Sequence, residues 1–239
     1  MSTGPRNAMR GTVTPTLKEQ WAEVLVFLFL ILPSMLLSFW VVRQGNTSFG
    51  VTASATILRD LALVSLVAFF LWRNDEPFDR LGWTSAHKGR EAVLGVALFV
   101  PFFLGTTALD RLLRDIGFSV PATPLPRSLT ASDRADFLLA CVLVAVVAIA
   151  EETIFRGYLI LRFRAVTRSP TAAVLLSSVT FSLGHGYEGS AGVVTVGVMG
   201  AVLALIYLWR RSLTAPIVMH FLQDFIAIAL GPLFGTVSR

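Results

Sequence analysis

The amino-acid sequence predicts an all-α, polytopic membrane protein: a transmembrane helical bundle of about seven spans, either seven or eight. Composition is the first observation, because 54% of the residues are hydrophobic, only 15% are charged and the mean hydropathy is +0.70. A soluble domain carries about 25% charged residues, so this chain has too few to cover a water-exposed surface. The second observation is that apolar runs of about 20 residues, enough to cross a bilayer as a helix, recur along the chain. The alternating pattern of a transmembrane barrel is absent.

Seven apolar stretches are predicted to span the bilayer. The first is longer than the roughly 7–15-residue core of a signal peptide, so we expect it to be retained. Polar connections follow at 73–90 and at 111–136, where prolines indicate an extramembrane loop, and a very short turn lies at 210–212. The predicted spans are Trp21–Val42, Val51–Trp72, Glu91–Leu109, Phe137–Leu161, Thr171–Gly186, Ala191–Trp209 and Thr214–Phe234.

The distribution of basic residues predicts the orientation of the bundle. With seven spans, the N-terminal segment 1–20, the connection 73–90, the stretch 162–168 and the turn at 210–211 share one side and hold most of the Lys and Arg. Basic loops face the cytoplasm, so this side and the N-terminus are predicted to be cytoplasmic, although the third loop on the opposite side is also rich in arginine. The preference for Arg over Lys favours a bacterial cell membrane.

The net charge of +5 does not predict nucleic-acid binding. The basic residues lie in short loops between apolar runs, where they control topology, rather than on one continuous face. The single cysteine, Cys141, excludes an intrachain disulfide and a thiolate-rich metal centre.

Ionisable residues occur inside four of the predicted spans, where each costs several kcal/mol and indicates function by default. Glu152 and Arg156 share a helix face at i, i+4, which favours a structural ion pair, whereas Glu151 points elsewhere. A pair at Arg59-Asp60 favours an interfacial or bundle-locking role. Four further groups are expensive in lipid unless they meet, so we expect one cavity to bring together Glu151, His185, His220 and Asp224.

Three short motifs fall, in order, on the fourth, fifth and seventh predicted spans. Residues 151–156 read EExxxR, residues 181–185 read FxxxH and residues 220–224 read HxxxD. In this order, within apolar helices, they resemble the CPBP family of intramembrane proteases, which includes the CAAX prenyl endopeptidases and bacteriocin-processing, abortive-infection-like proteins. The resemblance covers about Phe137 to Ala229. It divides the chain into the cytoplasmic segment 1–20, N-terminal helices and loops at 21–135, and a catalytic helical core at 136–235.

The resemblance also implies roles for individual residues. Glu151 resembles the glutamate that activates water and His185 the histidine that works with it, while His220 and Asp224 complete the catalytic set. Glu152, Arg156 and Phe181 match supporting positions. The prenyl endopeptidase branch usually has Asn where this chain has Asp224, and an ionised Asp cannot donate a hydrogen bond to an oxyanion.

The cofactor and the activity follow from the same resemblance. Zn²⁺ held by His185, His220, Glu151 and Asp224 is one alternative, and a metal-free, glutamate-dependent mechanism is the other. The predicted function is an intramembrane endopeptidase whose partners are the lipid bilayer and a peptide or protein substrate at the membrane, with its site open to the cytoplasmic side. The alternatives are a non-catalytic bacteriocin-immunity or scaffold protein and a proton-coupled transporter.

Overall fold

A computed structural model of the chain describes residues 15–44, 47–84, 87–120, 131 and 133–231. The described residues are helical with no strands, which confirms the predicted fold class. The long helices are α1 (Leu17–Gln44), α2 (Phe49–Arg73), α3 (Lys88–Asp115), α4 (Arg134–Glu151) and α7 (Gly189–Arg210). The shorter elements are η1 (Phe78–Leu81), η3 (Glu152–Leu159), α5 (Ile160–Thr167), α6 (Pro170–Leu183), η4 (Gly186–Glu188), α8 (Thr214–Asp224) and η5 (Phe225–Leu230).

Five helical segments are long and apolar enough to cross a membrane, and two shorter apolar helices make up the remainder of the seven predicted spans. The fourth span is longer than predicted, because α4, η3 and α5 run on from Arg134 to Thr167 over 34 residues. The fifth is shorter. Its helix, α6, has 14 residues and rises about 21 Å, less than the roughly 30 Å of a hydrocarbon core.

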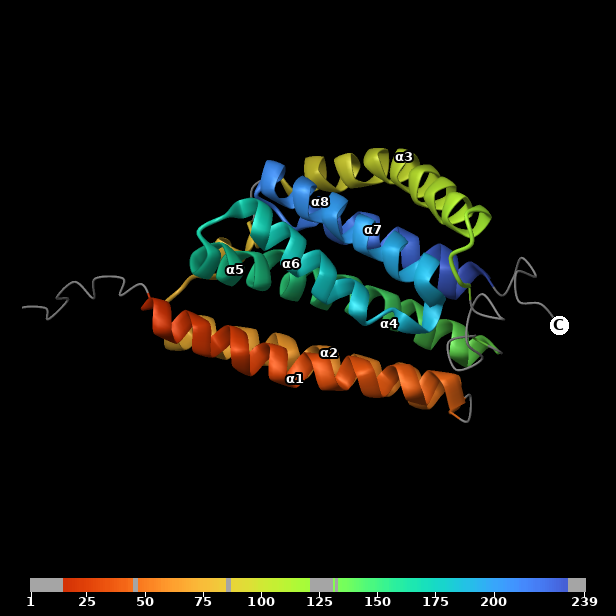
Figure 1. Ribbon diagram of the computed structural model, residues 1–239, viewed down its shortest axis with the longest axis horizontal. Helices are drawn as coiled ribbons and strands as arrows, with labels where there is room; N and C mark the ends of the chain where they lie inside the picture. Colours follow the sequence, from red (N-terminus) through yellow and green to blue (C-terminus); the bar gives the residue numbers. More distant parts are fainter. Residues whose placement is uncertain (1–14, 45–46, 85–86, 121–130, 132, 232–239) are drawn as a thin grey trace, which may run out of the picture.

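The helices form an elongated bundle in which the N-terminal spans flank the motif-bearing core (Figure 1). α1 and α2 lie along one edge and α3 along the opposite edge. α2 packs on α4, α3 packs on α8 and α7, and α6 packs between α5 and α7. Large apolar side chains face outward, including Phe29 and Trp72, each 75% exposed. Water would oppose such exposure, so these side chains fit lipid.

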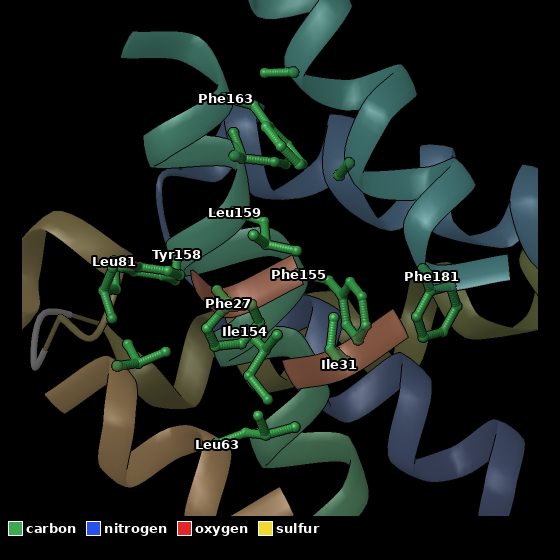
Figure 2. Packing of buried hydrophobic residues seen from close by; sticks show 14 of the residues in the cluster. Phe27, Ile31, Leu63, Leu81, Ile154, Phe155, Tyr158, Leu159, Phe163 and Phe181 are labelled. Atoms are coloured by element: carbon green, nitrogen blue, oxygen red, sulfur yellow. The ribbon is translucent and has the colours of Figure 1, made fainter. Parts of the chain in front are cut away.

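A buried apolar cluster fixes the position of η3, the segment that carries the first motif (Figure 2). Tyr158 lies against Phe27 of α1 and Phe70 of α2, with ring centroids 5.4 Å and 6.1 Å away. Phe155 meets Phe181 of α6 edge-on at 5.1 Å. Aromatic pairs at these distances add about 0.5–1.5 kcal/mol each beyond area burial. The first motif is therefore held between the N-terminal helices and α6.

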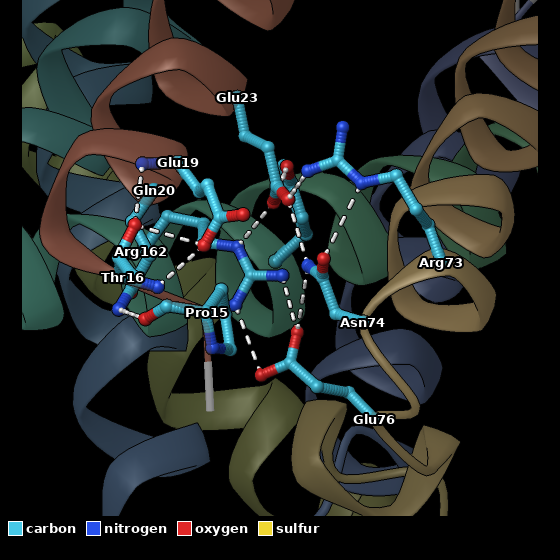
Figure 3. A network of polar contacts seen from close by, with 10 residues as sticks. Pro15, Thr16, Glu19, Gln20, Glu23, Arg73, Asn74, Glu76 and Arg162 are labelled. Carbon is cyan, nitrogen blue, oxygen red and sulfur yellow. Dashed lines mark hydrogen bonds and ion pairs between the residues drawn. The ribbon is translucent and has the colours of Figure 1, made fainter. Parts of the chain in front are cut away.

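An ionic network lies at one end of the bundle and joins α1, α2 and α5 (Figure 3). Arg162 is 1% exposed and donates from Nε to Glu23 at 2.7 Å and from its terminal nitrogens to Glu76. Glu23 also accepts from Arg73 at 2.7 Å and from the Tyr158 hydroxyl at 2.9 Å. Counting Arg162 as a loop charge was therefore wrong, because its guanidinium is buried between two carboxylates.

The basic segments do meet at this end, which we name the basic end. α1 and the connection after α2 join Arg162 there, and the backbone N–H of Leu213 donates to Gly82 at 3.1 Å. Arg210 also pairs with Glu91 near the start of α3, at 2.6 Å. The predicted sharing of one side is thus seen for the described residues. The predicted segment 1–20 lies outside them up to residue 14, as do Pro121, Pro124, Pro126 and residues 232–235 of the predicted core.

Candidate active site

The first motif lies where the fourth long helix changes its winding. α4 ends at Glu151, and the following eight residues form the π-helix η3. A π-helix leaves a backbone carbonyl without its usual partner, and Ser177 of α6 donates its hydroxyl to the Phe155 carbonyl at 2.7 Å. The second π-helix, η5, begins directly after Asp224. Single π-helical turns are rare and frequent at functional sites, and here each follows a predicted site carboxylate.

Glu152 and Arg156 form the predicted ion pair, with Nη1 2.9 Å from Oε1 and both side chains buried. The guanidinium lacks a well-directed hydrogen bond among the described residues. Instead it lies over the Phe181 ring at 4.2 Å from the centroid, a contact worth about 2 kcal/mol when desolvated. Gly200 of α7 makes room, since a Cβ there would lie 3.2 Å from Phe181. The pair therefore anchors the first motif to the second.

Glu152 also holds the imidazole of the third motif. Its Oε1 lies 2.8 Å from Nδ1 of His220, and a carboxylate oxygen can only accept when ionised, so Nδ1 carries a proton. Nε2 of His220 lies 3.3 Å from Asp224 and 3.7 Å from Glu151. Glu152 fixes Nδ1, and Asp224 shares Nε2 with Glu151.

His185 stands at the end of α6, beside the same aromatic ring. Its Nδ1 lies 3.2 Å from the Phe181 carbonyl, which can only accept, so Nδ1 is the protonated nitrogen and Nε2 is left as an acceptor. The rings of His185 and His220 lie 5.1 Å and 5.9 Å from the Phe181 ring. Phe181 thus separates and orients the two histidines.

One cavity of about 450 Å³ brings the four predicted catalytic residues together. Side chains from α1, α2, α4, α6, η4, α7, α8 and η5 contribute to its wall. The lining combines the predicted polar residues with apolar side chains of α4 and η5. The residues used below that line it are Arg59, Glu151, His185, Tyr187, Glu188, His220, Gln223 and Asp224, with Leu143, Val147 and Ile228 among its apolar side chains.

The two histidines line one cavity although they lie at different ends of their helices. His220 lies early in its helix and His185 follows the end of its own, which would separate them if both helices started at the membrane surface. α8 starts inside the protein, because Ser212 and Leu213 just before it are 4% and 1% exposed. α6 is too short to cross the bilayer. Both histidines lie beside the Phe181 ring and line one cavity.

The cavity extends away from the basic end, which differs from the sequence expectation. On α2 it is lined by Thr52, Thr56 and Arg59 in the first half of the helix, whereas Arg73 at the other end joins the ionic network. A smaller cavity of about 250 Å³ shares Glu188 and Gln223 with it and extends to the late residues of α3 and the early residues of α7. Water reaching the site from these cavities comes from the end opposite the basic segments.

Sequence reasoning missed several residues of the wall. Arg59 and Asp60 were assigned to an interfacial or bundle-locking role, yet Arg59 lines the cavity and Asp60 pairs with it. Tyr187 and Glu188 were not singled out at all. An ionisable pair in the middle of a span was the available signal for Arg59 and Asp60. No motif marks Tyr187 or Glu188.

The metal alternative receives no support from the donor geometry. Among the residues that the structure describes, no group of three or more His, Cys, Asp or Glu side chains is arranged to hold a metal ion. In particular, Nδ1 of His220 is turned to Glu152 and Nδ1 of His185 to a backbone carbonyl. The four predicted ligands line one cavity without forming a ligand set, so no step below is derived through a metal.

Comparison with known proteins gives one match. Residues 133–226 match the family model described as type II CAAX prenyl endopeptidase Rce1-like. No curated protein and no solved structure matches the chain. The matched residues run from the N-cap of α4 to η5 and contain all three motifs, and they leave out α1, α2 and α3. The match confirms the resemblance predicted from the motifs, because residues 133–226 are similar to the Rce1-like family and contain those motifs.

Proposed function

We propose that this chain is an endopeptidase that hydrolyses a peptide bond of a membrane-associated substrate. The observation that carries the proposal is the single cavity lined by Glu151, His185, His220 and Asp224 within the Rce1-like domain. A buried cavity with two imidazoles and two carboxylates is expensive in a membrane. Hydrolysis explains that cost, because it requires a base, a proton donor and a place for water.

Glu151 is the general base in this mechanism. Its carboxylate accepts a proton from a water molecule, and the water oxygen attacks the carbonyl carbon of the substrate while the carbonyl π electrons move to oxygen. His185 presents an unprotonated Nε2 to the same cavity and orients the water. The tetrahedral intermediate then collapses, the C–N bond breaks, and a proton passes to the leaving nitrogen. The products are a carboxylate and an amine.

His220 holds and supplies protons beside that base. Nδ1 is fixed by Glu152, and Nε2 faces oxygens of Asp224 and Glu151. At least one proton must lie between Nε2 and these carboxylates, because bare lone pairs at 3.3 Å would repel. This proton lies beside Glu151, so His220 can donate it to the departing amine while Glu151 keeps the proton taken from water. Asp224 serves here as the partner of His220 rather than as an oxyanion donor.

The test is cleavage by the full-length protein in lipid nanodiscs. A library of single-span peptides with varied flanking sequences is incubated with the protein, and new termini are identified by mass spectrometry. Cleavage by the wild type and its loss in a folded Glu151→Gln variant would support the proposal. A library left intact by wild type, or cleaved equally by both proteins, would contradict it. Proton uptake coupled to transport, with no new termini, would favour the transporter alternative instead.

A further inference from the structure

The described residues that line the cavity include neutral donors in Thr52, Thr56, Tyr187 and Gln223, but Arg59 is the one Lys or Arg among them. Hydrolysis of a peptide bond places a negative charge on the former carbonyl oxygen, and a site that stabilises it needs N–H or O–H groups directed into the cavity. Glu151, Glu188 and Asp224 contribute acceptors when ionised. The imidazoles are committed as well: His220 faces carboxylates through both nitrogens, and His185 spends its N–H on a backbone carbonyl.

Arg59 is the cationic donor of this wall. Its Nε and Nη2 both approach Oδ1 of Asp60, each at 2.9 Å, which leaves Nη1 without an ion-pair or hydrogen-bond partner among the described residues. The Asp60 side chain is 2% exposed and anchors the guanidinium, while the Arg59 side chain keeps 33% of its surface exposed. Arg59 is therefore held from one side and open on the other.

The position of Arg59 along α2 matches the level of the base. α2 and α4 pack on each other and both start at the end away from the basic end. Ala53 of α2 packs in one buried cluster with Ala140 and Leu143 of α4. Arg59 is six residues after Ala53, and Glu151 is eight residues after Leu143. Arg59 and Glu151 line the same cavity.

We propose that Arg59 is a catalytic residue that donates hydrogen bonds to the oxyanion of the tetrahedral intermediate. The proposal deepens the proposed protease function and rests on it. It assigns to α2, outside the matched residues 133–226, a direct part in the reaction. When the intermediate forms, the carbonyl π electrons rest on oxygen beside the guanidinium, and they return when the C–N bond breaks. The guanidinium keeps all its protons throughout, since its ordinary pKa is too high for it to act as an acid.

The experiment uses the peptide cleaved best in the library assay and compares three variants with the wild type. Arg59→Lys keeps a cation, Arg59→Gln removes it, and Arg59→Gln with Asp60→Asn removes both charges while keeping two amides that can bond to each other. Ser65→Ala, six residues later on α2, exposed and outside the cavity lining, is the matched control for a small change on this helix. Each variant is first checked for folding by its thermal transition in detergent.

An oxyanion donor predicts a specific kinetic pattern. Removing one such donor lowers kcat by about 10²–10³-fold, and the expected KM change is less than about threefold because the donor acts on the transition state. The double variant should fold and still show this kcat loss, Arg59→Lys should retain part of the activity, and Ser65→Ala should match the wild type.

Two outcomes would overturn the assignment. A folded double variant with wild-type kcat would show that Arg59 only neutralises Asp60. A loss confined to KM would make Arg59 a substrate-binding residue. Failure of the protease proposal is separately visible, because Glu151→Gln is measured with the same peptide.

Discussion

Two buried clusters of charge in this molecule differ in how completely their groups are paired. In the ionic network at the basic end, Glu23 accepts from Arg73, Asn74, Tyr158 and Arg162, and Glu76 is bonded by arginines. At the cavity, a buried oxygen of Gln223 in the wall has no hydrogen-bond partner among the described residues. The same holds for one oxygen each of Asp60 and Glu152, which contact the lining residues Arg59 and His220. Complete pairing is what a structural cluster requires, whereas unpaired polar atoms beside a cavity leave room for water and substrate.

Substitutions in the two clusters should therefore have different consequences, one for the stability of the fold and the other for activity. Removing a member of the ionic network leaves an opposite charge buried and should destabilise the fold. Neutralising a carboxylate at the cavity removes a charge that was poorly compensated, so it should spare the fold and affect chemistry. The predictions below use this contrast, in order of decreasing expected effect.

Glu151→Gln should produce the largest effect, on activity alone. Loss of a general base lowers rates by about 10²–10⁴-fold, while the amide keeps the shape of the side chain. Cleavage of the library peptide measures the rate, and thermal unfolding in detergent measures the fold. Asp110→Asn, on the wall of the smaller cavity, serves as a control. An inactive Glu151→Gln protein that is also unfolded would break the contrast between the clusters.

Arg162→Met should produce the largest loss of stability. The substitution keeps much of the apolar stem but leaves Glu23 and Glu76 buried without their shared cation. Breaking a buried pair costs about 3–5 kcal/mol. Arg80→Met is the matched control, since Arg80 also pairs with Glu76 but is 42% exposed, and exposed pairs contribute about 0–1 kcal/mol. Equal unfolding midpoints for the two variants would mean that burial does not set the cost.

Arg156→Ala tests an ion pair that is buried like the ionic network but also contacts a residue of the cavity. Arg156 is buried like the network arginines, but its partner Glu152 also holds His220 in the site. We expect a lower yield of folded protein, with a cost in the same range of about 3–5 kcal/mol, or somewhat less because the cation–π contact is its main directed interaction. A variant that is stable and folded but inactive would contradict the supporting role assigned to Arg156.

The sequence predicted contacts between residues one turn apart on the same helix, and it missed contacts that depend on how different helices pack. The spacing of Glu152 with Arg156 and of His220 with Asp224 is fixed by helical geometry, and both contacts exist. Burial of Arg162 depends on Glu23, 139 positions away, so a local pattern of basic residues could not distinguish it from a loop charge. The π-helices are likewise invisible to a periodicity of 3.6.

The place of the cavity shows the same limit for function. The three motifs predicted the residues that meet, since lipid makes isolated ionisable groups costly. The contribution of α2 could not be predicted, because the pair Arg59-Asp60 reads equally well as a structural lock. The expected opening on the basic side was based on the distribution of basic residues, which does not indicate which half of α2 lines the cavity.

The smallest predicted effect is a pH dependence confined to the ionic network. Glu76 lies outside the membrane-spanning helices. Burial would raise its pKa, but hydrogen bonds and attraction from Arg162, with a further contribution from Arg80, outweigh burial and hold the pKa below its ordinary value of 4.5. A depressed folded-state pKa contributes stability that is present above the unfolded-state value and is lost as pH falls through the folded-state value. Stability should thus decline below about pH 4.5.

Glu76→Gln should cost about 1.5–3 kcal/mol at neutral pH, the contribution of hydrogen bonds to a charged group. The difference from wild type should shrink as the pH is lowered, because a protonated Glu76 resembles the amide. Unfolding midpoints at pH 7 and pH 4 measure both values, and Asp79→Asn, an exposed carboxylate in η1, is the control. A difference between Glu76→Gln and wild type that stays constant with pH would show that the network stabilises the fold through shape rather than charge.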